Sequence, residues 1–157
     1  MADQGAVERQ ALDTGVERLK PLLATYGFRF SRGGGGLSSG GSFAVGRFVR
    51  PPLEIGLIVR NKSELGCPNY SRGTGFAGHD DLFAELGQTG QEVLVRASEE
   101  LGHLAYVGKD GRTAFEALYF DLENGVLPAL QRSEREFLGA LDRAVARHQQ
   151  RLSGHSA

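Results

Sequence analysis

The chain has 157 residues, of which 40% are hydrophobic and 24% charged, and its formal net charge is −1. These values are those of one globular domain and leave no room for a second. Cys67 is the only cysteine, which excludes an intramolecular disulfide and a multi-cysteine metal site and fits a reducing compartment. Residues 1–7 lack the regions of a secretory signal, and the apolar run 53–59 is too short to span a bilayer. We therefore expect a single cytoplasmic domain over residues 1–157.

Residues 7–26 predict an amphipathic helix that Gly27 ends. Apolar side chains recur there at three- and four-residue spacing, which places them on one side of a helix. Thr14 and Glu17 have capping-box spacing and Pro21 interrupts the pattern, so the helix is expected either to begin late or to bend before the proline.

Period-two alternation after this helix predicts an antiparallel meander of three strands, each with one buried face. The second strand changes its apolar parity at Gly46, from Phe43 and Val45 to Phe48, which predicts a bulge at the glycine. Two prolines, which cannot donate ladder hydrogen bonds, separate it from the third strand. The expected strands are 28–31, 43–50 and 53–60.

Residues 33–42 are rich in glycine and serine, and we expect them to form a flexible hairpin loop. The glycines and the final serine of residues 35–42 have P-loop spacing. However, Gly41 stands where that motif needs lysine, and strand-like sequence follows where it needs a helix. A looser anion cradle of backbone N–H groups is the alternative to a bare hairpin.

A second glycine motif, residues 73–78, matches the dinucleotide fingerprint. The residues before it include Pro68 and Asn69, where the fingerprint requires an apolar strand. We therefore expect turns with positive φ there. The surrounding segment, 61–78, is rich in turn formers and is predicted as loop, with a short edge strand near Tyr70.

The remainder of the chain predicts helices. Residues 82–86 fit a short helix that Gly87 closes, and capping-box spacings precede further helical periods at 89–92, 113–116 and 133–136. The first of these three signals competes with a hairpin if residues 92–97 form a strand. The predicted class is α+β, with an N-terminal helix, the meander, and three to four C-terminal helices packed on one sheet face. Residues 153–157 are predicted to be a disordered tail.

We find no catalytic, cofactor or metal constellation. Adjacent His79, Asp80 and Asp81 are better explained by capping of a helix N-terminus than by metal binding. Cys67 has no basic neighbour and is expected to be an inert thiol. The carboxylates of the helix expected near residues 113–123 are interpreted as its solvent side. They are Glu116, Asp121 and Glu123.

Charge is distributed unevenly along the chain. Residues 28–72 hold seven basic and two acidic residues, a local net charge of +5. Such a basic strand face indicates an anionic partner, although a solvated face is the plain alternative. The predicted partner or anion-binding residues are Arg29, Arg32, Arg47, Arg50, Arg60, Tyr70 and Arg72.

Three functions from different classes follow. The first is a small non-catalytic protein-interaction module, of the accessory or immunity type, whose basic sheet face meets an acidic protein. The second is a module for an anion, a nucleotide or nucleic acid, which is less favoured because single-strand binders expose several aromatic rings. The third is an enzyme with a site near Tyr70, Arg72 and His79. We predict no cofactor, no metal and no membrane partner, and the oligomeric state is not readable.

Overall fold

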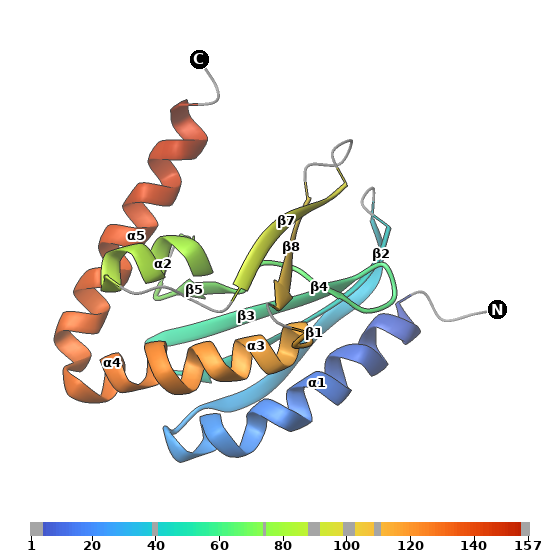
Figure 1. The fold of residues 1–157 in the computed structure, drawn as a ribbon, viewed down its shortest axis with the longest axis horizontal. Helices are drawn as coiled ribbons and strands as arrows, with labels where there is room; N and C mark the ends of the chain where they lie inside the picture. Colours follow the sequence, from blue (N-terminus) through green and yellow to red (C-terminus); the bar gives the residue numbers. More distant parts are fainter. Residues whose placement is uncertain are drawn as a thin grey trace.

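The computed structural model describes residues 5–38, 41–73, 75–87, 92–98, 103–108 and 111–154. It confirms the expected α+β order of an N-terminal helix, an antiparallel meander and C-terminal helices (Figure 1). The helices are α1 (Ala6–Thr25), α2 (His79–Leu86), α3 (Ala114–Asp121), the π-helical segment η1 (Leu122–Val126), α4 (Leu127–Arg132) and α5 (Glu134–Gly154). The strands are β1 (Arg29–Ser38), β2 (Gly41–Arg50), β3 (Leu53–Arg60), β4 (Glu64–Leu65), β5 (Asn69–Ser71), β6 (Phe76–Gly78), β7 (Glu92–Ser98) and β8 (His103–Gly108).

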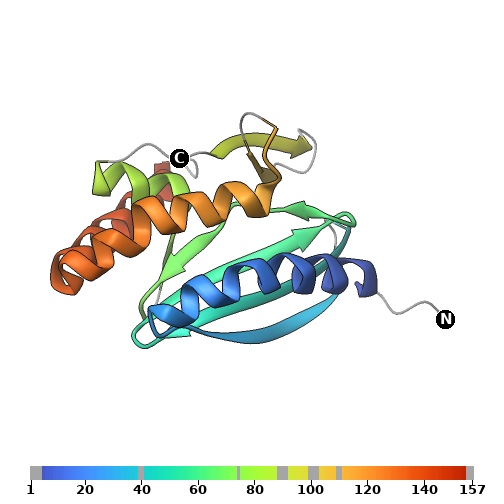
Figure 2. The same ribbon diagram turned by 60° about the horizontal axis from the view of Figure 1, so that its bottom comes forward.

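Helix α1 packs along strands β1, β2 and β3 (Figure 2). Its predicted apolar stripe is confirmed, because Leu12, Val16, Leu19 and Leu23 are all buried. Each fully buried leucine contributes about 1.5–3 kcal/mol of transfer free energy. The helix begins well before Thr14 and contains Pro21, so the late start is wrong.

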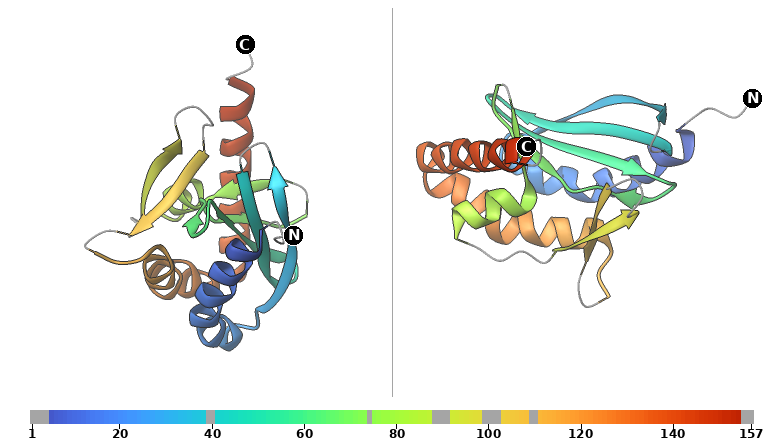
Figure 3. Two further views of the ribbon diagram at one scale, coloured as in Figure 1. Left: turned by 90° about the vertical axis from the view of Figure 1, so that its right-hand side faces the viewer. Right: turned by 90° about the horizontal axis from the view of Figure 1, so that it is seen from above.

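The main sheet has the order β1-β2-β3-β5-β6, with β4 paired to β3. The helices gather on one face of strands β1–β3 and leave the opposite face uncovered (Figure 3). We call the helix-covered side the inner face and the uncovered side the outer face. The predicted alternation of β3 is confirmed, since its buried residues are Leu53, Ile55, Leu57 and Val59.

The inward positions of β2 correct the sequence prediction. The β2 residues that are buried are Ala44, Gly46 and Phe48. Phe43 and Val45 are half-buried with the opposite parity, and the pairing of β2 with β3 runs through Gly46 without a shift. A Cβ at Gly46 would lie 2.6 Å from Cζ of Phe30. The glycine therefore makes room for this ring rather than for a bulge.

The bulge lies in β1, where Gly33 and Gly34 together face Val45. Residues 33–38 are strand rather than the predicted loop, and residues 39 and 40 of that prediction lie outside the described residues. Close approach explains two of the glycines. A Cβ at Gly33 would lie 2.8 Å from Cγ2 of Val45, and one at Gly35 would lie 2.9 Å from the carbonyl oxygen of Phe43. The glycine run is the tightly paired edge strand of the sheet.

The second glycine motif forms a hairpin between β5 and β6. Gly73 and Gly75 have φ values of +78° and +83°, which confirms the predicted turns. A short strand near Tyr70 is confirmed as β5, but it pairs on both sides, with β3 and with β6, so it is not the predicted edge strand. Helix α2 follows β6 directly and ends at Gly87, whose φ is +69°. The motif contains no strand-to-helix turn of the dinucleotide-binding kind.

Residues 92–98 and 103–108 pair as the antiparallel strands β7 and β8, and residues 92–98 are not the predicted helix. The alternative that made residues 92–97 a strand is thereby confirmed. Strand β8 contacts helix α3, and β4 contacts β8, so the hairpin lies beside the helical layer (Figure 1).

The predicted capping boxes at Thr113 and Ser133 begin helices α3 and α5. Thr113 and Glu116 exchange backbone-to-side-chain hydrogen bonds of 3.0 and 3.2 Å, and Ser133 Oγ accepts from the N–H of Glu136 at 3.2 Å. Asn124 and Gly125 are residue types typical of turns, but η1 connects α3 to α4 as continuous helix. Residues 153 and 154 of the predicted tail belong to α5, and 155–157 lie outside the described residues.

Candidate functional site

The register of the sheet determines which polar side chains share the outer face. Cross-strand partners lie on the same side of a sheet, and alternate residues of a strand lie on opposite sides. Two partner rows cross the outer face from β1 to β5. They are Arg29, Val49, Glu54 and Ser71, and Ser31, Arg47, Gly56 and Asn69. Two shorter rows pair Val45 with Ile58 and Phe43 with Arg60.

Of the seven predicted site residues, only Arg29, Arg47 and Arg60 share the outer face. Arg47 Nη1 lies 3.3 Å from Oε2 of Glu54, and both side chains are exposed by more than a third. Neither Arg29 nor Arg60 forms an ion pair with any residue of the described ranges. The outer face thus holds two unpaired guanidinium groups.

Three other predicted arginines pair with helices instead. Their partners are acidic residues outside segment 28–72, so the two oppositely charged parts of the chain neutralise one another. The pairs are Arg32 with Asp13 of α1 at 2.6 Å, Arg50 with Glu134 of α5 at 3.5 Å, and Arg72 with Asp142 of α5 at 3.6 Å. Exposed pairs of this kind stabilise a fold only weakly, by about 0–1 kcal/mol each. Ion pairs between the sheet and the helices therefore neutralise much of the local charge of +5 within the fold.

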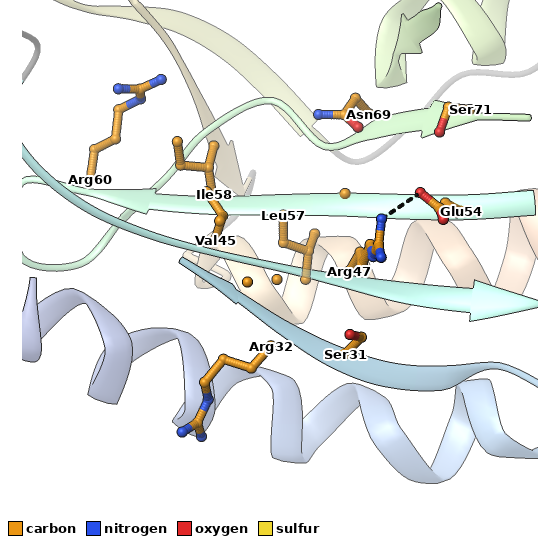
Figure 4. A pocket seen from close by; sticks show the side chains of 13 residues that line it. Ser31, Arg32, Val45, Arg47, Glu54, Leu57, Ile58, Arg60, Asn69 and Ser71 are labelled. Carbon is orange, nitrogen blue, oxygen red and sulfur yellow. Dashed lines mark hydrogen bonds and ion pairs between the residues drawn. The ribbon is translucent and has the colours of Figure 1, made fainter. Parts of the chain in front are cut away.

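A groove of about 480 Å³ lies on the outer face between strands β1 and β5 (Figure 4). Val45 and Ile58 contribute apolar surface, while Asn69 on β5 supplies hydrogen-bonding groups. Arg60 lies toward one end of the groove, and Arg47 points toward Glu54 near the other. Arg32 also borders the groove, but its side chain turns away toward α1. The groove is shallow, cationic and free of aromatic residues.

Tyr70 and His79 meet in the interior rather than on the surface. Tyr70 Oη lies 2.8 Å from Nδ1 of His79, and Nε2 of the same ring lies 2.9 Å from Oδ2 of Asp121. Tyr106 donates its hydroxyl to that oxygen at 2.6 Å. All four side chains are at most 2% exposed, and the ring of Phe83 packs 4.3 Å from that of His79, centroid to centroid.

This buried network joins four elements: β5, α2, β8 and α3. Nε2 faces a carboxylate, which favours the tautomer that carries its proton at Nε2, and in that tautomer Nδ1 accepts the Tyr70 hydroxyl. Arg72 lies at the surface with Asp142. Tyr70 and His79 are buried, so the three residues of the enzyme hypothesis do not line one surface site.

Two members of this network were missed by sequence reasoning. Asp121 was interpreted as part of a solvent-facing row, whereas it is 2% exposed; Glu116 and Glu123 of that row are exposed as predicted. Tyr106 was not singled out. The network pairs are separated by 9, 42 and 15 residues along the chain, so no local spacing marks them.

The acidic residues at the start of α2 cap the helix and hold it to α5. The Asp81 carboxylate accepts from the N–H of Gly78 at 3.3 Å and from Nη2 of Arg151 at 2.6 Å. Glu85 pairs with two arginines of α5, at 3.2 and 2.8 Å. Across the described ranges, no three His, Cys, Asp or Glu side chains are grouped closely enough to hold a metal ion.

Cys67 has the properties of the inert thiol that was predicted. Burial is the main cause that raises its pKa, to about 11, and the nearby carboxylates of Asp80 and Asp81 act in the same direction. A thiol with so high a pKa carries almost no thiolate at neutral pH.

Comparison with protein-family models, with curated proteins and with solved structures gave no match. Within the described part of the chain, no helix has both the length and the apolar character needed to cross a bilayer.

Proposed function

We propose that this chain is a small non-catalytic binding module, of the accessory or immunity type, that docks an acidic protein through the outer face of its sheet. The observation that carries the proposal is the uncovered sheet face. It carries Arg29, Arg47 and Arg60, of which Arg47 and Arg60 line a groove, and Arg29 and Arg60 form no ion pair among the described residues. An unpaired guanidinium presents a fork of N–H donors that matches a carboxylate.

The composition of this face favours a protein partner. Protein interfaces combine apolar centres with arginine and are depleted in lysine and glutamate. Half-buried Val45 and Ile58 supply apolar surface between the cations, and Asn69 and Ser71 supply hydrogen bonds at the edge. Single-stranded nucleic acid, in contrast, needs exposed rings for base stacking, and no aromatic residue lines the groove.

The proposal is tested by charge neutralisation that spares the fold. Arg29→Gln/Arg60→Gln removes two cations of the outer face that make no ion pair in the described structure. Arg132→Gln/Arg135→Gln is the matched control, because these exposed arginines of α4 and α5 are unpaired among the described residues as well. Wild type and both variants are immobilised on a support and incubated with an extract of the native source, with and without nuclease treatment.

We expect wild type and the control to retain one stoichiometric acidic protein and the outer-face variant to lose it. For the purified partner, neutralising two interfacial arginines is expected to weaken binding about 100-fold. Equal retention by all three proteins, capture of nucleic acid alone, or no stoichiometric partner would each overturn the proposal.

A further inference from the structure

A second groove, of about 530 Å³, lies on the opposite side of the molecule from the outer face. Its floor is formed by α1, including half-buried Ala11 and buried Gly15, and Phe115 at the start of α3 forms an apolar wall. The two helices approach closely here, since a Cβ at Gly15 would lie 2.4 Å from the ring of Phe115. Lys62 and Ser63, from the turn between β3 and β4, complete the groove.

Lys62 is held at this groove in a left-handed conformation. Asn61 and Lys62 have φ values of +49° and +79° and are the only non-glycine residues of the described ranges with positive φ. The turn is fixed from both sides. The N–H of Asn61 donates to the carbonyl of Ser42 at 3.2 Å, and the N–H of Lys62 donates at 2.6 Å to the carboxylate of Glu8, which is 2% exposed.

A strained residue that its surroundings hold in place points to a role for its side chain. Glycine would adopt this conformation without strain, so the lysine adds a cation to the groove at a cost in stability. The ammonium group is exposed and makes no ion pair with the described residues. The other cation of the groove, Arg18, already lies 3.6 Å from the carboxylate of Glu116. The groove therefore offers one unsatisfied positive charge beside an apolar floor.

We propose that this groove binds a small amphipathic carboxylate. The apolar part of the ligand lies against Ala11, Gly15 and Phe115, and its carboxylate meets the ammonium of Lys62 and the hydroxyl of Ser63. A single negative charge fits because one cation is unpaired, and the volume admits a ligand with an aromatic ring and a short chain. This site shares no residue with the outer-face groove, so each proposal stands or fails without the other.

The test is an amide NMR titration of the full chain with 4-phenylbutyrate and with its neutral counterpart, 4-phenylbutan-1-ol. With the acid, we expect saturable chemical-shift changes at the amides of Ala11, Gly15 and Ser63. The alcohol should bind at least about tenfold more weakly, because it lacks the charge-assisted hydrogen bond of the carboxylate. Shifts of equal size with both probes, or no saturable shift at millimolar acid, would overturn the proposal.

Two variants test whether Lys62 supplies the cation that binds the carboxylate. Lys62→Gly removes the charge without backbone strain and is expected to weaken binding about tenfold while the melting temperature holds or rises. Lys62→Asn, which also tolerates the left-handed conformation, should give the same loss, so the test survives if one variant folds poorly. Lys20→Gln, at an exposed site outside the groove, is the control and should bind as wild type. Unchanged affinity in the folded Lys62 variants would refute the site.

Discussion

Removal of one hydroxyl group from the buried network should cost more than the hydrogen bond itself contributes. Tyr70→Phe deletes the group that lies 2.8 Å from Nδ1 of His79, and His79 has no exposed surface at which water could replace it. Leaving a buried acceptor unsatisfied costs about 1–3 kcal/mol. At about 2 kcal/mol, a chain of this length should melt about 4–8 °C lower. Urea unfolding with a shared m-value measures the free-energy change directly.

The coupling between Tyr70 and His79 can be measured in a double variant. In a His79→Leu background the hydroxyl of Tyr70 has lost its contact with Nδ1, so adding Tyr70→Phe should cost less than it does in wild type. The resulting double-mutant cycle should give a coupling free energy of about 1–3 kcal/mol between Tyr70 and His79. The reasoning would be refuted if Tyr70→Phe lowered the free energy of unfolding by less than about 0.5 kcal/mol, or if the effects of the two substitutions on that free energy were additive.

Three further predictions concern single residues. Gly46→Ala places a Cβ 2.6 Å from the half-buried ring of Phe30 and should cost about 1–3 kcal/mol. Gly34→Ala, with nothing within 4 Å, should stay within about 0.5 kcal/mol of wild type in urea unfolding, and equal costs would contradict the strand geometry. Hydrogen bonds from the backbone and then the side chain of Thr113 lower the pKa of Glu116 from 4.5, so the stabilisation is present above that value and lost as the pH falls through the folded-state pKa. Carboxyl NMR should show this pKa moving back toward 4.5 in Thr113→Ala, and an unmoved pKa would exclude the capping box as its cause. Because the pKa of Cys67 is raised from 9.0 to about 11, iodoacetamide should alkylate it about 100-fold more slowly at pH 8 than an ordinary thiol; an ordinary rate would show that the thiol is accessible and ionisable.

The elements that could be predicted from the sequence are those with local signals. The apolar stripe of α1 and the alternation of β3 each follow from a period that the chain repeats several times. The capping boxes at Thr113 and Ser133 depend on residues only three positions apart. For residues 92–98 the local signals conflict, since alternating valines favour a strand and capping-box spacing favours a helix. Pairing with β8, whose partner residues lie 5 to 16 positions further along the chain, decides for the strand.

The site could be predicted only in part, because its membership depends on contacts between distant residues. Arg29, Arg47 and Arg60 have the parity of the outer face. Arg32 and Arg50 are instead paired with the inward positions Gly46 and Leu53, and they reach acidic residues of α1 and α5. The parity of β2 was misassigned because its aromatic Phe43 was expected inside. The buried positions beside α1 instead belong to small residues, Ala44 and Gly46, where the ring of the neighbouring strand fills the space.

Methyl cross-saturation on the complex with the captured acidic protein tests the docking face most directly. The same strands carry methyl groups on both sides, so the experiment contains its own control. We predict saturation transfer to the outer-face methyl groups of Val45, Val49 and Ile58. The buried inner-face methyl groups of the same meander, which belong to Ile55, Leu57 and Val59, should receive none. Transfer confined to methyl groups away from the sheet, such as those of exposed Val7 or Leu152, would contradict the proposed interface.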